Sequence, residues 1–193
     1  MIASFLSAAA AQLRPSVVGI LDGTDRGESG GAGIAWGKSG LIVTNAHVAT
    51  GPDVTVVVAD GRRARGEVVA RNTRRDLAVV RVRELALPGA PPGDPARLRP
   101  GSLVFAVGHP FGVRHAVSAG VLQAVGRLPR GFAMSRLGAA EWVQADVRLA
   151  PGNSGGPLAD ATGHVIGVAA MIVGGLALAV PAGDVNALLA TLQ

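Results

Sequence analysis

Ser154 lies in a run of small residues that can expose a hydroxyl group on a tight turn. Glycine occupies positions 152, 155 and 156, and glycine accepts backbone angles that other residues cannot. Such a turn aims successive backbone N–H groups into one hollow, where a developing negative charge can be held. A serine with these donors beside it is suited to acyl transfer, in which its oxygen attacks a carbonyl carbon.

A serine hydroxyl is a weak nucleophile at neutral pH, so this turn predicts a base and a group that orients the base. Both candidates lie upstream, His47 in the sequence Thr-Asn-Ala-His-Val and Asp76 in the sequence Arg-Asp-Leu-Ala-Val-Val. Taken alone, either could be an ordinary residue at a strand end. The order His47, Asp76, Ser154 is that of the chymotrypsin-type triad, and it differs from the orders in subtilisins and α/β-hydrolases.

In the predicted mechanism, His47 takes the proton of Ser154 during attack on a peptide carbonyl and later returns it to the leaving amine. Asp76 holds the imidazole in the required tautomer. The oxyanion hole is predicted on the turn formed by Gly152, Asn153 and Ser154, with the backbone N–H groups of Gly152 and Ser154 as its donors.

The chain resembles the protease domain of the HtrA (DegP-like) serine proteases, within the trypsin-fold superfamily. The resemblance implies a serine endopeptidase of protein quality control that cleaves unfolded or misfolded polypeptides, without a cofactor. It also implies a cell-envelope or other extracytoplasmic location. The motifs that carry it occur in the matching order and cover nearly the whole chain: Thr44–Val48, Arg75–Val80, Gly108–Gly112 with Val117–Gly120, Gln144–Leu158 and Ala179–Pro181.

The resemblance also implies where the primary specificity pocket lies. Its apolar members suggest a shallow slot suited to Val, Ala or Leu. Arg148 replaces the small residue that is usual in this family; turned outward it leaves the slot apolar, whereas turned inward it would favour acidic side chains. The implied lining residues are Arg148, Leu149, Ala150, Leu176, Ala177 and Leu178.

Two features of the HtrA family are missing from this sequence or weak in it. HtrA proteins carry one or two PDZ domains after the protease domain; none follows here, either because this is a PDZ-less member or because a longer chain was trimmed. The N-terminal segment offers only Phe5 and Leu6 as apolar anchors, which does not favour a trimer and leaves a monomer open. An alternative function is a chaperone-like binding module whose oxyanion turn rests in a collapsed state and hydrolyses little.

Composition narrows the classes of protein further. The chain has 193 residues, 49% of them hydrophobic, and no cysteine, which excludes disulfides and thiolate metal sites. His109, His115 and His164 lack metal-ligand spacing, so no metal site is expected. The net charge of +5 comes mainly from arginine, and no aromatic residues are interleaved for base stacking. Solvated loops are therefore favoured over nucleic-acid binding for the cluster Arg62, Arg63, Arg65, Arg71, Arg74 and Arg75.

Two apolar runs could be mistaken for membrane segments. Ile2–Ala11 has no basic residue before it, as a secretory signal would, and is too short to span a bilayer. Val165–Val180 contains three glycines and ends at Pro181, so a buried hairpin that turns near Gly174 is the better interpretation. No membrane span is expected.

Short apolar runs separated by turn residues dominate the sequence, and a proline-rich segment divides them into two groups of six. We therefore predict an all-β protein of two six-stranded antiparallel β-barrels with short terminal helices. Asp184 is predicted to cap the closing helix. The expected divisions are an N-terminal helix (1–13), a first barrel (14–87), a linker (88–100), a second barrel (101–183) and a C-terminal helix (184–193).

Overall fold

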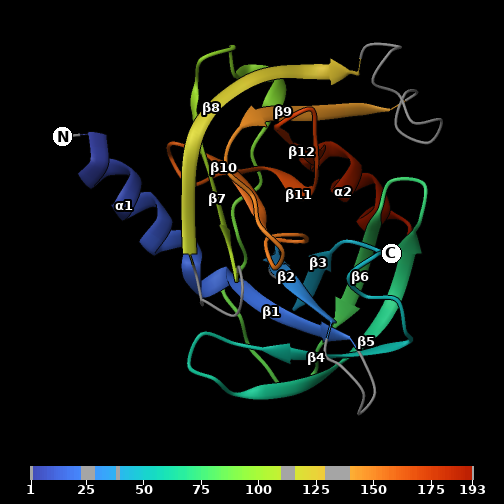
Figure 1. Ribbon diagram of the computed structural model, residues 1–193. Helices are drawn as coiled ribbons and strands as arrows, with labels where there is room; N and C mark the ends of the chain where they lie inside the picture. The colour runs from blue at the N-terminus through green and yellow to red at the C-terminus, as the bar shows by residue number, and fades with distance from the viewer. Residues whose placement is uncertain (1, 23–28, 38–39, 110–115, 129–139, 193) are drawn as a thin grey trace.

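The computed structural model describes residues 2–22, 29–37, 40–109, 116–128 and 140–192, which form two closed antiparallel β-barrels (Figure 1). The first barrel has the strand order β1-β2-β3-β6-β5-β4. Its strands are β1 (Val17–Asp22), β2 (Ser29–Trp36), β3 (Leu41–Thr44), β4 (Asp53–Val57), β5 (Arg63–Asn72) and β6 (Leu77–Arg81).

The second barrel repeats this topology, with the strand order β10-β11-β12-β9-β8-β7. The predicted fold class of two six-stranded barrels is therefore confirmed. The strands are β7 (Leu103–Gly108), β8 (Ala116–Arg127), β9 (Glu141–Asp146), β10 (Pro157–Asp160), β11 (Val165–Val173) and β12 (Leu176–Pro181).

Each barrel is filled by aliphatic side chains that point inward from its strands. On β4, for example, Val54 and Val56 are buried while the residues between them are partly exposed, as expected when successive side chains point to opposite faces. Such β-branched residues pack well on a pleated surface. The fillings are separate: the first barrel encloses Val18, Ile20, Ile42, Val56 and Val80, and the second encloses Val104, Leu122, Val143, Leu158 and Ile166.

A third apolar cluster joins the two barrels, and it contains the large aromatic side chains. Trp36 comes from β2, Phe105 from β7 and Trp142 from β9, and all three are at most 4% exposed. Aliphatic residues of both barrels complete the cluster. Because aromatic side chains bury large areas, the contact between the barrels is where this aromatic-poor chain concentrates its bulkiest packing.

The proline-rich segment runs from one barrel to the other along their surfaces. Ala90 pairs with Trp36 of the first barrel, and Pro92 pairs with Val165 of the second. A short 3-10 helix, Pro95–Arg97, follows, with the Asp94 side chain accepting from the Ala96 N–H at 2.9 Å. These pairings hold the connection against both barrels.

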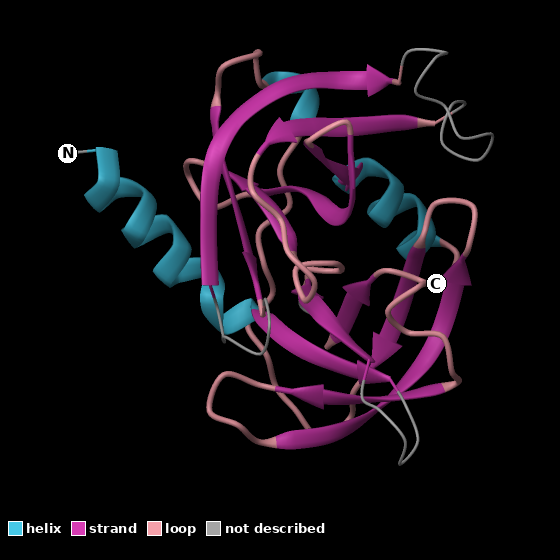
Figure 2. Ribbon diagram, in the orientation of Figure 1, coloured by secondary structure: helices cyan, strands magenta, loops and turns pink. Residues whose placement is uncertain are grey.

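Two α-helices flank the barrels (Figure 2): α1 (Ile2–Leu13) packs Ala9, Ala10 and Leu13 into the apolar cluster between the barrels, and α2 (Ala182–Ala190) packs against β11 and β12. The prediction that Asp184 caps the closing helix is wrong. The helix begins at Ala182, with Pro181 at its N-cap and no capping side chain. Asp184 therefore lies in the first turn, where its carboxylate is directed at Arg75. Neither described helix is long and apolar enough to cross a membrane.

Candidate active site

His47 and Asp76 are in direct contact at one end of the first barrel. His47 lies on the turn after β3, and Asp76 lies in the tight turn between β5 and β6. The His47 Nδ1 atom is 2.7 Å from Asp76 Oδ2, and the backbone N–H of His47 donates to Asp76 Oδ1 at 3.0 Å. Asn45 Nδ2 donates to the backbone carbonyl of Asp76 at 2.9 Å. The acid thus holds both the ring and the backbone of the histidine.

The backbone of Asp76 adopts an unusual conformation. Its φ angle is +54°, and it is the one non-glycine residue with a positive φ among the described residues. Short polar side chains tolerate this left-handed region better than most, but it still costs free energy and persists only where the surroundings impose it. Here the hydrogen bonds from Asn45 and His47 impose it, and they direct the carboxylate toward the ring.

The charge of Asp76 changes the protonation of His47. The hydrogen bond from the ring to the Asp76 carboxylate raises the pKa of His47 above its usual 6.5, more than desolvation of the ring lowers it. The His47 side chain remains 50% exposed, so a substrate can approach it. A ring held in this way can accept a proton at Nε2 and be stabilised as an imidazolium.

The loop after His47 is fixed by a second carboxylate. Both the N–H and the hydroxyl of Thr50 donate to Asp22 Oδ2 at 2.5 Å, and the Gly51 N–H does so at 3.2 Å. Arg71 donates to the carbonyls of Ala49 and Gly51 at 2.7 Å each. Burial raises the pKa of Asp22, but the bonds from Thr50 and Gly51 and the nearby charge of Arg71 outweigh it and lower the pKa.

Ser154 lies on a turn that packs against strands of the first barrel. The backbone N–H of Ala32, on β2, donates to the Ser154 carbonyl at 2.7 Å. Gly155, with a φ of +85°, has no room for a side chain, because a Cβ atom there would overlap the Ala32 carbonyl and the Thr44 hydroxyl. The nucleophile candidate of the second barrel is therefore held by backbone atoms of the first.

The Ser154 hydroxyl donates to the Ala170 carbonyl at 3.3 Å. Ala170 is the extra residue of a β-bulge: Ala169 pairs with Ala179 and Met171 with Leu178, which leaves Ala170 between them without a cross-strand partner. In the described part of the chain, Ser154 has no hydrogen bond to His47. The Ser154 hydroxyl is therefore bound to a backbone carbonyl in this structure.

The Ser154 turn also leaves backbone donors unused. Gly152 has a φ of +101°, and within the described residues neither its N–H nor that of Ser154 has a hydrogen-bond partner. The Asn153 N–H instead donates to the Ala150 carbonyl at 3.0 Å. Of the three turn residues named for the oxyanion hole, Gly152 and Ser154 therefore have free N–H groups, and Asn153 shapes the turn between them.

The residues expected around the specificity pocket fall into three groups by exposure. Arg148 is exposed. Leu149 is partly buried against the core of the second barrel, and Leu178 is fully buried in the cluster between the barrels. Ala177 is buried, and Ala150 and Leu176 are partly exposed.

The structure adds residues to this site that the sequence analysis did not single out. Asn45 belongs to the same motif as His47, so its role could have been suspected from that motif. Ala32 and Ala170 act through their backbone atoms, which leave no mark on residue type. No group of three or more potential metal ligands occurs within the described residues; His115 lies outside them.

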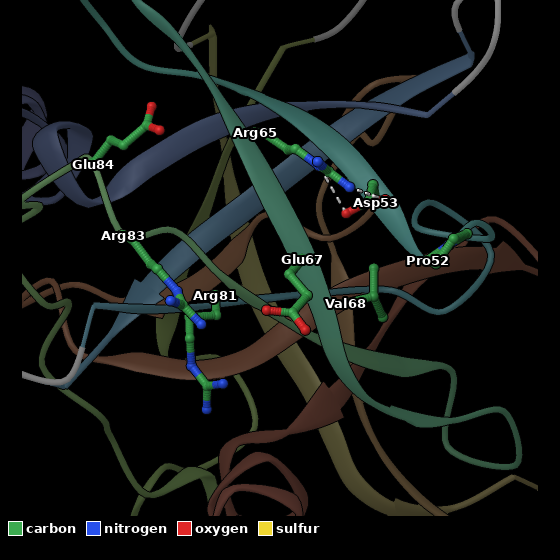
Figure 3. Close-up of a pocket in the computed structure, with 8 residues that line it drawn as sticks. All are labelled: Pro52, Asp53, Arg65, Glu67, Val68, Arg81, Arg83 and Glu84. Carbon is green, nitrogen blue, oxygen red and sulfur yellow. Dashed lines mark hydrogen bonds and ion pairs between the residues drawn. The ribbon is translucent and has the colours of Figure 1, made fainter.

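A charged groove of about 520 Å³ lies elsewhere, on the outside of the first barrel (Figure 3). Arg65 donates to both carboxylate oxygens of Asp53 at 3.0 and 2.7 Å, and Glu67 is the cross-strand neighbour of Arg81. None of His47, Asp76 and Ser154 lines it. The groove is lined by charged residues that are paired across neighbouring strands of the barrel wall. It is separate from the candidate site.

Comparison with known proteins places this geometry among peptidases. The family of trypsin-like peptidase domains matches residues 31–168. A probable periplasmic serine endoprotease, DegP-like, from Halomonas elongata is 40% identical over 144 residues, covering 74% of this chain and 29% of that protein. The putative serine protease HhoA of Synechocystis sp. is 38% identical over 170 residues, covering 84% of this chain and 42% of that protein.

Solved structures agree with these sequence matches. The HtrA-type protease AlgW with a tripeptide superposes with a TM-score of 0.86 at 29% identity, covering 97% of this chain and 63% of that one. The chain spans less than half the length of the curated relatives described above.

Proposed function

This chain belongs to the family of trypsin-like peptidase domains, and we propose that it is a serine endopeptidase that hydrolyses unfolded polypeptides with His47, Asp76 and Ser154. The observation that carries the proposal is the His47–Asp76 contact of 2.7 Å, on the barrel into which the Ser154 turn is set. Relatives named as serine endoproteases support it. They do not favour the alternative of a binding module with little hydrolysis.

The proposed reaction begins when Ser154 leaves the Ala170 carbonyl and turns its hydroxyl toward His47. The His47 ring takes the proton as the oxygen attacks the peptide carbonyl carbon, and Asp76 stabilises the imidazolium that forms. The free N–H groups of Gly152 and Ser154 then bind the oxyanion, and each such donor contributes about 3 kcal/mol of transition-state stabilisation. The proton passes to the leaving amine, and water releases the acyl group.

An open strand edge beside Ser154 favours an extended peptide as substrate. In the described part of the chain, Met171–Val173 pairs with β12 on one side only. A peptide that adds to this edge as an extra strand gains backbone hydrogen bonds that do not depend on its sequence. Unfolded chains can adopt that extended form, whereas folded proteins cannot without local opening.

We further propose that cleavage follows small or medium aliphatic residues such as Val, Ala or Leu. Leu149 and Leu176 are partly exposed and offer apolar surface, and the exposed Arg148 side chain is proposed to turn outward. An uncompensated charge would be costly to desolvate there, which disfavours acidic and basic side chains. Peptide-library profiling of the wild type and Arg148→Ala tests this, because an acidic preference that disappears in the variant would contradict it.

The names of the relatives suggest where such an enzyme works. Several are called periplasmic endoproteases, and one, from Arabidopsis thaliana, is called chloroplastic. We propose an extracytoplasmic location with unfolded polypeptides as partners, which fractionation of the native cells would test.

The decisive experiment compares the wild type with Ser154→Ala on unfolded casein and with a serine-directed fluorophosphonate probe. We expect the wild type to cleave casein and to be labelled at Ser154. Loss of the nucleophile should reduce the cleavage rate by about four or more orders of magnitude. Equal cleavage by both proteins would contradict the proposed function. Suppressed aggregation without labelling of Ser154 would instead support the binding-module alternative.

A further inference from the structure

Arg75 immediately precedes Asp76, but its side chain leaves the first barrel and contacts the second half of the molecule. Its Nε atom donates to Asp184 Oδ2 at 2.8 Å, and its Nη2 atom also donates to that oxygen. Nη2 donates to the Glu141 carbonyl at 2.8 Å as well. The guanidinium lies over Trp142, 5.0 Å from the ring centroid. One side chain thus joins three residues of the second half.

One of these partner segments leads along the chain to the Ser154 turn, and the other follows β12, the strand paired with β11. Glu141 and Trp142 begin β9, and the chain that leaves β9 leads to Ser154. Asp184 lies in the first turn of α2, which directly follows β12. The Arg75 side chain is only 16% exposed, so solvent screens its contacts less than those of an ordinary surface ion pair.

The neighbouring Asp76 faces the other way. Its carboxylate and its carbonyl bind His47 and Asn45, all within the first barrel. The turn itself is closed by the Arg75 N–H, which donates to Asn72 Oδ1 at 3.1 Å. Asp76 therefore holds the proposed acid–base pair within the first barrel. Arg75, on the same turn, attaches that turn to the second half of the molecule.

We propose that Arg75 is a positioning residue that holds the His47–Asp76 pair in the correct place relative to Ser154. The proposal rests on the proposed function, since it concerns the geometry of that reaction. His47 and Ser154 come from different barrels, and proton transfer between them requires close approach in a defined orientation. A largely buried planar fork that stacks on an aromatic ring and bonds to two separate segments restricts how the barrels shift at this point.

The test compares Arg75→Ala and Arg75→Lys with Arg74→Ala, a neighbouring exposed arginine, as the matched control. We expect kcat of Arg75→Ala to fall by about tenfold to a hundredfold, since a small misplacement of reacting groups has that effect, while KM changes little. The apparent pKa on the acidic side of the pH dependence of kcat/KM should be the same as in the wild type, because the His47–Asp76 contact is intact. Arg75→Lys should restore part of the loss, and Arg74→Ala should match the wild type.

Asp184→Asn and the double variant Arg75→Ala/Asp184→Asn complete the test and serve if Arg75→Ala does not fold. Because Arg75 and Asp184 are in contact, the double variant should lose less than the product of the two single losses. A wild-type kcat in both single variants, or an apparent pKa of kcat/KM that shifts with the loss, would overturn the positioning role. A wild type without Ser154-dependent cleavage would instead contradict the proposed function itself.

Discussion

The two halves of the proposed site are built by different means. On the first barrel, the Asp76 carboxylate accepts from the His47 ring at 2.7 Å and from the His47 backbone N–H at 3.0 Å, so the two residues are already in contact. On the second, Ser154 is positioned by backbone bonds and by glycines with positive φ, and its hydroxyl is bound to Ala170. The acid–base pair is thus assembled in advance, whereas the nucleophile needs a side-chain rotation to join it.

This difference indicates which substitutions each half of the proposed site tolerates. The His47–Asp76 half depends on chemical groups, so a change of charge or donor type should disable it without altering the fold. The Ser154 half depends on space and backbone angles, so even one added methyl group should disable it. The four predictions below separate these dependences.

The largest effect should come from Asp76→Asn, which keeps the size of the side chain but removes its charge. The amide cannot hold the His47 ring in the required tautomer, and we expect kcat to fall by about 10⁴-fold while the fold persists. Steady-state kinetics with a chromogenic peptide measures the loss, and circular dichroism checks the fold. Asp53→Asn, an exposed carboxylate of the same barrel, serves as the control. A kcat within tenfold of the wild type would argue against an assembled pair.

Gly155→Ala should have the next largest effect, through space alone. A positive φ costs a non-glycine residue about 1–3 kcal/mol, and here the added Cβ would also overlap the Ala32 carbonyl and the Thr44 hydroxyl. We expect kcat to fall by about a hundredfold or more, because the nucleophile is displaced from the first barrel.

Gly101→Ala is the matched control for Gly155→Ala. It has a φ of +87° but open space around it, so it carries the backbone strain without the overlap. Kinetics and thermal unfolding of both variants separate the two costs. Equal effects would show that strain, rather than the contact between the barrels, determines the Ser154 turn.

The pKa of His47 offers a third test, since no hydrogen bond joins His47 to Ser154 in the described part of the chain. Titration of the ring by NMR should give a pKa above 6.5 in the wild type, unchanged in Ser154→Ala and lower in Asp76→Asn. Activity that needs a neutral ring should rise with pH through that raised value. The stabilisation from the charged pair has the opposite sign: it is fully present below 6.5 and is lost as the pH rises through the folded-state pKa. A pKa that shifts in Ser154→Ala would show that the halves are coupled at rest.

The smallest effect should come from Asp22→Asn, which weakens the support of the loop after His47. An amide oxygen can still accept one of the bonds from Thr50 and Gly51, so we expect a loss of about 1 kcal/mol in the free energy of unfolding. The pKa of Asp22 is lowered, so its contribution is present above 3.8 and is lost as the pH falls through the lower folded-state value. Denaturant titrations at neutral and acidic pH should therefore differ between wild type and variant only at neutral pH. A constant difference would contradict the charge-based explanation.

The sequence predicted what depends on residue type and spacing. Short strands separated by turns predicted both barrels, because alternation and turn residues are local properties. The motifs around His47, Asp76 and Ser154 predicted a triad, and the structure brings the first two into contact; their catalytic roles remain predictions. The expected domain boundaries also remain predictions.

Contacts between residues far apart in the chain could not be predicted in this way. Asp184 was expected to cap a helix because local sequence favours aspartate at that position. Instead it bonds to Arg75, which is 109 positions away along the chain. The bonds from Ala32 to Ser154 and from Ser154 to Ala170 use backbone atoms, which every residue carries. Such contacts depend on how the barrels dock and not on any local pattern.

The aromatic cluster between the barrels has a spectroscopic consequence. The chain contains two tryptophans and no tyrosine, and both tryptophans lie in that cluster, one of them beneath the Arg75 guanidinium. Intrinsic ultraviolet emission therefore arises almost entirely from the seam where the barrels meet. Quenching or a red shift would report separation of the barrels while each remained folded. The two tryptophans therefore report on the barrel arrangement that the proposed approach of His47 and Ser154 requires.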